Sequence, residues 1–330
     1  MKDDTVKAIS GKSMPMYRRI APAVGLFFLS PLVAEFLLGN ISISAIFSLL
    51  FLAPMYGGGA ILIREITRRT NRRWVTMILL GLAYGVLEEG LITQSLFNPS
   101  YANENLLSIA HIPVLGIGAW WTLFVLTLHT VWSTSIPIVL TESLVPRRRT
   151  APWLGKIGLG VTIVLFILGA IGNFYGSYAQ SRFLADAPQL IGTMIAIIVL
   201  VVIAFCIKKR SRRNVKGTAP NQWLVGLSSF VASSLFMVFR DHGWVTVGFW
   251  IVLYIIMIIL CTRWSRSEGW GLSHQVALAG GALLTYAWHG FPEVPVIGAK
   301  GTVDLIGNII FAIGAIVLLI LTLNRVKKSK

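Results

Sequence analysis

The sequence has few charged residues, and acidic residues are the scarcest of them. Only 13% of the 330 residues are charged, with 13 Asp and Glu against 29 Lys and Arg. Soluble domains carry about 25% charged and about 45–50% apolar residues, whereas this chain is 55% hydrophobic. This deficit of charge excludes an ordinary soluble globular domain. The apolar residues form long blocks instead of alternating patterns, which predicts an all-α, polytopic integral membrane bundle.

Cysteine is also scarce, and no cleavable signal peptide is evident. Cys206 and Cys261 each fall near a predicted cytoplasmic helix end, where a structural disulfide is not expected. The first apolar block is long enough to span a bilayer and lacks a small-residue cleavage site. The net charge of +16 would suit nucleic acid. Because the basic residues gather in short clusters between apolar blocks, as topology signals do, we expect the lipid bilayer as the partner and no nucleic acid.

Ten apolar blocks are present, and each is long enough to span a bilayer as a helix. They lie at about 20–39, 42–62, 74–96, 117–141, 157–175, 188–207, 223–239, 244–262, 271–291 and 303–323. No segment between them has the length of a soluble domain. The sequence therefore predicts one transmembrane domain over 20–323, flanked by an N-terminal tail at 1–19 and a basic C-terminal tail at 324–330.

The basic residues predict the orientation of this bundle. If both termini are cytoplasmic, all of the 29 Lys and Arg lie on the inner side except Arg182, Arg240 and Lys300. Cytoplasmic loops of membrane proteins carry an excess of Lys and Arg. We therefore expect a multi-pass protein of the cell membrane with both termini in the cytoplasm.

Two adjacent carboxylates, Glu88 and Glu89, interrupt the third predicted helix. A charged side chain at mid-bilayer costs at least ~2.5–3.5 kcal/mol on insertion scales, so such residues usually belong to functional sites. Two neighbouring carboxylates also repel each other unless they are protonated, paired or bound to a metal. On an ideal helix they diverge by about 100°, which places Glu89 with Gly81 and Gly85 and leaves Glu88 beside Tyr84.

The fourth predicted helix returns inward and carries His129. Glu88 and Glu89 lie roughly 20 Å from the inner end of their helix, and His129 lies roughly 18 Å from the inner end of its own. Consecutive antiparallel helices thus bring Glu89 and His129 to one depth. The small residues Gly81 and Gly85 let the neighbouring helix approach closely. The sequence predicts that Glu89 and His129 are in contact.

Further polar groups lie toward the predicted outer side, including Glu35, Asn173 and His289. Glutamate and histidine together suit a divalent metal such as zinc. We therefore expect a polar cavity in the outer half of the membrane, with Glu89, His129 and His289 as candidate metal ligands and Glu88, Glu89 and His129 as candidate catalytic residues.

These residues resemble the motifs of the CAAX protease and bacteriocin-processing family of intramembrane proteases. That family carries Glu-Glu-x-x-x-Arg, then Phe-x-x-x-His, then a later histidine with Asn or Asp four residues on. Glu88, Glu89 and His129 match the first two motifs, with Thr93 in place of the arginine and Val125 in place of the phenylalanine. The likeness covers 84–141 only. It implies an intramembrane hydrolase in which the glutamates and histidines bind or activate a catalytic water, together with a metal.

Three functions remain open on the sequence alone. In a metal-dependent hydrolase, Glu88 or Glu89 would be the general base and His129 a metal ligand or oxyanion partner. In a secondary transporter, the same residues would form a proton- or cation-coupling site near the midplane. In a non-catalytic membrane scaffold, they would be a buried clamp. The substrate cannot be predicted from the sequence.

Overall fold

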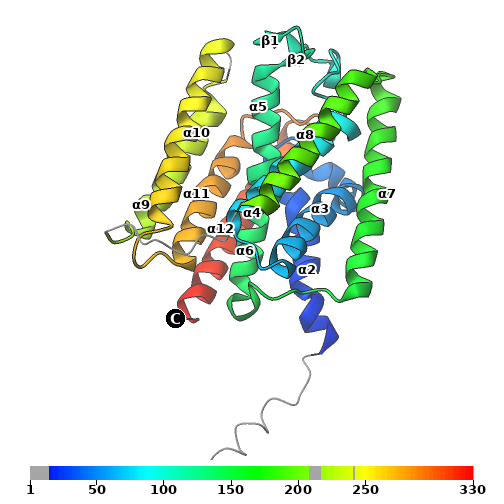
Figure 1. Ribbon diagram of the computed structural model, residues 1–330. Coiled ribbons are helices and arrows are strands. Elements are labelled where there is room, and N and C mark those ends of the chain that lie inside the picture. The colour runs from blue at the N-terminus through cyan, green and yellow to red at the C-terminus, as the bar shows by residue number, and fades with distance from the viewer. Residues whose placement is uncertain (1–14, 208–216, 241, 330) are drawn as a thin grey trace, which may run out of the picture.

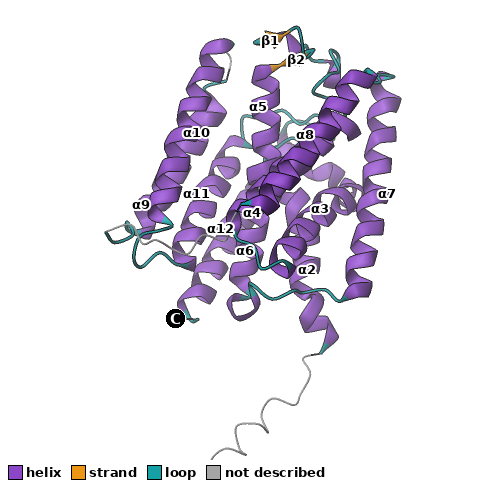
Figure 2. Ribbon diagram, viewed as in Figure 1, coloured by secondary structure: helices purple, strands orange, loops and turns teal. Residues whose placement is uncertain are grey.

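The computed structural model describes residues 15–207, 217–240 and 242–329, which form a bundle of helices with two very short strands (Figures 1 and 2). All ten predicted helices have a counterpart. Their bounds are α2 (Met16–Pro31) continued by η1 (Leu32–Phe36), η2 (Ile43–Ser48) continued by α3 (Leu49–Arg69), α4 (Trp74–Leu87) continued by η3 (Glu88–Ile92), α5 (Ala119–Leu128), η6 (His129–Ser135) and α6 (Ile136–Leu144) as one rod, α7 (Lys156–Ser181), α8 (Ala187–Cys206), α9 (Gln222–Val238), α10 (Trp244–Trp264), α11 (Leu272–His289) and α12 (Thr302–Lys327).

Short elements connect these helices. The segment after η3 contains the single turns η4 (Tyr101–Asn103) and η5 (Leu106–Ser108), and η7 (Pro146–Arg148) follows α6. The strands β1 (His111–Ile112) and β2 (Ile117–Gly118) pair antiparallel, with His111 opposite Gly118. They lie at one end of the bundle, above α5 in Figure 1.

Eight of the described helices are long and apolar enough to cross a membrane. The other two are α9, which is shorter, and α11, which lies inside the bundle and carries many small residues. An interior helix contacts other helices instead of lipid, so it does not need a continuous apolar surface. The all-α membrane fold is confirmed, whereas ten crossings and cytoplasmic termini stay predictions. Residues 1–14 of the predicted N-terminal tail lie outside the described residues, and α12 extends into the predicted C-terminal tail.

The helices divide into a buried group and a peripheral group. In the spanning windows of α4–η3 and of α5–α6, 61% and 67% of the residues are buried, against 11% in those of α7 and α8. The surfaces of α7, α8, α10 and α12 are rich in exposed Ile, Val and Leu. Because lipid tails are as apolar as these side chains, the peripheral helices suit contact with the bilayer. The ionisable residues of α4–η3 and of α5–η6–α6 are thereby kept away from lipid.

A buried ion network lies near the end of α3 that the topology places inside. The guanidinium of Arg64 is fully buried, donates to Glu142 (3.1 Å) and Glu65, and lies 3.6 Å from the ring centre of Trp153. Arg68 also donates to Glu142 (2.8 Å). The sequence placed Arg64 beyond a helix ending near 62, but α3 continues to its end at Arg69. This residue is therefore part of the packed interior and not of a solvated loop.

Candidate functional site

One buried cluster lies between α4–η3 and α5–η6–α6, and it consists of Glu88, Glu89 and His129. The Nε2 atom of His129 lies 2.7 Å from Oε1 of Glu89, and its Nδ1 atom lies 3.1 Å from Oε2 of Glu88. All three residues are at most 5% exposed. The predicted contact between Glu89 and His129 is confirmed.

The small-residue stripe of α4 lets the two rods approach as predicted. A β-carbon added at Gly85 would lie 3.1 Å from Cβ of His129, and one added at Gly81 would lie 2.7 Å from Oγ1 of Thr134. Larger side chains at these positions would therefore separate the rods. The glycines fix the distance at which Glu89 meets His129.

Glu88 lies beside Tyr84 as predicted, but the prediction that it points away from the partner of Glu89 is wrong, because the helix changes its winding at this residue. The segments η3 and η6 are π-helical, and the amide of Thr93 donates to the carbonyl of Glu88 at 2.8 Å in the wider i to i+5 pattern. In this wider turn both carboxylates reach the same imidazole instead of diverging. Single π-turns within α-helices occur frequently at functional sites.

Hydroxyl groups surround the carboxylate of Glu89 and the ring of His129. Thr93 donates to Oε2 of Glu89 at 3.0 Å, and Ser95 donates to the same oxygen. Ser95 in turn accepts from the indole of Trp121 (3.0 Å). The residue at the arginine position of the protease motif, Thr93, thus contacts the carboxylate directly. These hydrogen bonds fix the orientation of the Glu89 carboxylate.

A third carboxylate, Glu35, adjoins the cluster through a tyrosine. Glu35 lies in the π-helical segment η1 and accepts from the hydroxyl of Tyr56 (2.6 Å) and the amide of Asn40 (2.5 Å). The ring of Tyr56 lies 5.8 Å from that of His129. Sequence reasoning treated Glu35 as a separate polar group and missed Tyr56 and Ser95. A signal for Tyr56 existed in the Gly57-Gly58-Gly59 run that follows it, since glycines mark a close helix crossing.

The other predicted wall residues lie elsewhere. The Nδ1 atom of His289 is 3.5 Å from Oε2 of Glu293, so this histidine belongs to a different group of side chains. Asn173 donates to the carbonyl of Gly169 within its own helix (2.8 Å). Neither residue belongs to the cluster of Glu88, Glu89 and His129 that the described residues form.

The cluster has the donor atoms of a metal site. Glu88, Glu89 and His129 each offer one ligand atom, and these atoms lie within 4.8 Å of one another. Oε2 of Glu88 is buried, and the ion-pair contact with Nδ1 of His129 is 3.1 Å long. Carboxylate and imidazole donors suit zinc and related divalent ions. A divalent cation would also balance the two negative charges of Glu88 and Glu89, so the residues fit a metal.

A model of one protein family matches residues 25–324 of the chain, and its description is an uncharacterized membrane protein family. The chain belongs to this family. No curated protein and no solved structure matches the sequence. As a member of this membrane protein family with several spanning helices, the chain is a multi-pass membrane protein. The family match gives no support to the resemblance to the CAAX protease family.

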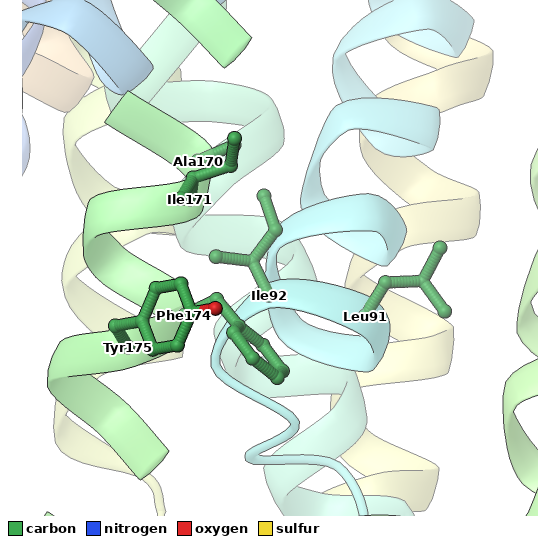
Figure 3. A pocket seen from close by; sticks show the side chains of 6 residues that line it. All are labelled: Leu91, Ile92, Ala170, Ile171, Phe174 and Tyr175. Carbon is green, nitrogen blue, oxygen red and sulfur yellow. The ribbon is translucent and has the colours of Figure 1, made fainter. Parts of the chain in front are cut away.

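The region of the family match includes a depression beside the cluster. It has a volume of about 370 Å³ and is lined by Leu91 and Ile92 of η3 and by Ala170, Ile171, Phe174 and Tyr175 of α7. Figure 3 shows Ile92 projecting toward α7 while Leu91 points away from it. Because α7 is a peripheral helix, this apolar depression lies at the surface that faces lipid. It borders the same π-turn that positions Glu88 and Glu89.

Proposed function

We propose that the protein is a metal-dependent intramembrane hydrolase of the cell membrane. The observation that carries the proposal is the convergence of Glu88, Glu89 and His129 within 4.8 Å, buried inside a membrane bundle. Glu89 and His129 would hold the metal, and Glu88 would act as general base. The substrate would be a molecule whose polar, hydrolysable bond enters the bilayer, since the cluster lies among spanning helices.

The contacts of the two carboxylates support their different roles. Two hydroxyls, from Thr93 and Ser95, donate to Oε2 of Glu89 and hold this carboxylate in position as a ligand. Glu88 receives neither of these hydroxyls, and its Oε2 atom lies 3.1 Å from Nδ1 of His129, so we assign it the role of proton acceptor. A bound divalent metal would polarise a carbonyl oxygen and lower the pKa of a water. The imidazole of His129 contacts both carboxylates and keeps them apart from each other.

Metal analysis with matched variants tests this proposal. Purified wild-type protein should retain a divalent metal, whereas Glu89→Gln and His129→Ala should lose it. Glu104→Gln is the control, because Glu104 is exposed in the loop after η3. Equal metal content in the wild type and in all three variants would remove the basis of the hydrolase.

The third carboxylate favours a second candidate function, a proton- or cation-coupled transporter. Glu88 and Glu89 contact the imidazole of His129, and Glu35 adjoins it through Tyr56. One divalent ion does not balance three negative charges if all three carboxylates are ionised. Exchange of protons or cations at such a group is the usual chemistry of coupling sites in transporters. In proteoliposomes, cation-dependent proton flux that Glu35→Gln abolishes would favour the transporter. Flux equal to that of empty liposomes would reject it.

A further inference from the structure

A second group of charged side chains lies between the end of α11 and the start of α12, apart from the Glu88–Glu89–His129 cluster. Here the chain forms a depression of about 210 Å³, whose lining includes Glu293, Lys300 and Asp304. It lies at the end of α12 opposite the C-terminus marked in Figure 1, which is the predicted outer side. The proposed hydrolase does not use these residues.

The acidic side of this depression contains an unsatisfied buried oxygen. Asp304 is 6% exposed, and its Oδ2 atom accepts from Asn308 (3.2 Å), whereas its Oδ1 atom has no hydrogen-bond partner. Glu293 lies 3.8 Å from Arg240 and 3.5 Å from His289. Burial raises the pKa of Glu293, and Arg240 opposes this shift. An unpaired buried carboxylate oxygen is unfavourable, so a ligand that donates hydrogen bonds would stabilise it.

The same depression has a basic residue and exposed apolar residues in its lining. Lys300 is exposed and has no ion-pair partner among the residues that the structure describes. Phe291, Val294 and Leu305 of the lining are also exposed. A depression lined by both acidic and basic side chains suits a ligand that carries both charges. Exposed apolar side chains at the end of a spanning helix suit a molecule that is anchored in the bilayer.

We propose that this depression binds the headgroup of a phospholipid that carries a primary ammonium and a phosphate. The ammonium donates to Oδ1 of Asp304 and to Glu293, and the phosphate accepts from Lys300. The acyl chains follow the exposed apolar side chains toward α12. A choline headgroup has no N–H to donate, and a glycerol headgroup has no cation. A serine headgroup would add a carboxylate beside Glu293 and Asp304, so an ethanolamine headgroup is the chemistry that best matches the three side chains.

Lipid binding to the purified, detergent-solubilised protein tests the proposal. Native mass spectrometry should show phosphatidylethanolamine binding about tenfold more tightly than phosphatidylcholine or phosphatidylglycerol of the same chains, because the N–H contacts with Asp304 and Glu293 are lost with each alternative. Asp304→Asn should remove this preference. Lys300→Gln should weaken the binding of all three lipids, since they share the phosphate, and Glu104→Gln should change neither the preference nor the affinity.

Two further measurements keep the test decisive. Asp304 also positions Asn308, which donates to the carbonyl of Gly290 (2.8 Å), so Asp304→Asn alone is open to a folding defect. Lys300 has an exposed side chain, and Lys300→Gln should leave the melting temperature unchanged. Free phosphoethanolamine should compete only weakly, since it lacks the acyl chains. Equal binding of the three lipids, or an unchanged lipid affinity in Lys300→Gln, overturns the proposal. Strong competition by free phosphoethanolamine would show that a soluble headgroup, and not a lipid, is the ligand.

Discussion

Glu89→Gln separates a metal site from a structural clamp. The substitution keeps the shape of the side chain and removes its charge. The carbonyl of glutamine still accepts from Thr93 and Ser95, and the other tautomer of His129 accepts from the new amide. In a metal site we therefore expect the metal-free protein to lose little stability, because the repulsion between Glu88 and residue 89 is also relieved.

The size of the expected shift in melting temperature follows from the stabilisation that a bound metal provides. A ligand at 100 times its dissociation constant stabilises the folded state by about 2.7 kcal/mol. Since 1 kcal/mol shifts the melting temperature of a chain of 150–250 residues by roughly 2–4 °C, zinc should raise the melting temperature of the wild type by about 5 °C. The melting temperature of Glu89→Gln should not respond to zinc. The assay is thermal unfolding in detergent, with chelator and with zinc.

A structural clamp gives the opposite pattern. Leaving buried partners unsatisfied costs about 1–3 kcal/mol, so His129→Ala would melt several degrees lower. The wild type would not respond to zinc. A large fall in melting temperature for His129→Ala, with no metal response in the wild type, would refute the metal site and favour the scaffold function.

The remaining predictions concern catalysis, the inner ion network and topology. Glu88→Gln should abolish hydrolysis yet retain the metal, since Glu88 acts as base; metal loss on elemental analysis would make it a ligand instead. Arg64→Met should destabilise the protein by about 1–3 kcal/mol in detergent melts, because it removes one charge-assisted hydrogen bond from each of Glu65 and Glu142, which then keep only Arg69 and Arg68 as ion-pair partners. An unchanged melting temperature would show that the network is not stabilising. A reporter fused after α12 should read cytoplasmic, and an external signal would invert the predicted topology.

The membrane fold and the main contact of the site could be predicted because they depend on periodicity and depth. Apolar blocks of spanning length located all ten helices, and equal depth on antiparallel neighbours brought Glu89 to His129. Gly81 and Gly85 indicated which face of α4 meets its neighbour. These signals are local in the sequence, so no tertiary information was needed.

The parts of the structure that could not be predicted from the sequence depend on irregular helical turns and on contacts between distant residues. Glu88 joins the cluster only because η3 is wound as a π-turn, whereas the predicted angle assumed regular α-helix. The sequence alone suggested that Arg64 is a topology signal. Its ion-pair partner Glu142 is distant in the sequence, and Trp153, whose ring it contacts, follows a loop. Glu35 of η1 reaches the cluster through Tyr56, which lies in α3. Pairings of this kind between distant residues leave no periodic pattern.

The measurement that tests the central claim most directly is the metal content of the purified protein. If Glu89 and His129 hold a catalytic metal, elemental analysis of the wild type after gentle purification should find about one divalent ion per chain. Glu89→Gln and His129→Ala should contain almost none, and Glu104→Gln should match the wild type. A wild type with no more divalent metal than Glu89→Gln and His129→Ala, even after incubation with zinc and removal of the excess, would contradict the account.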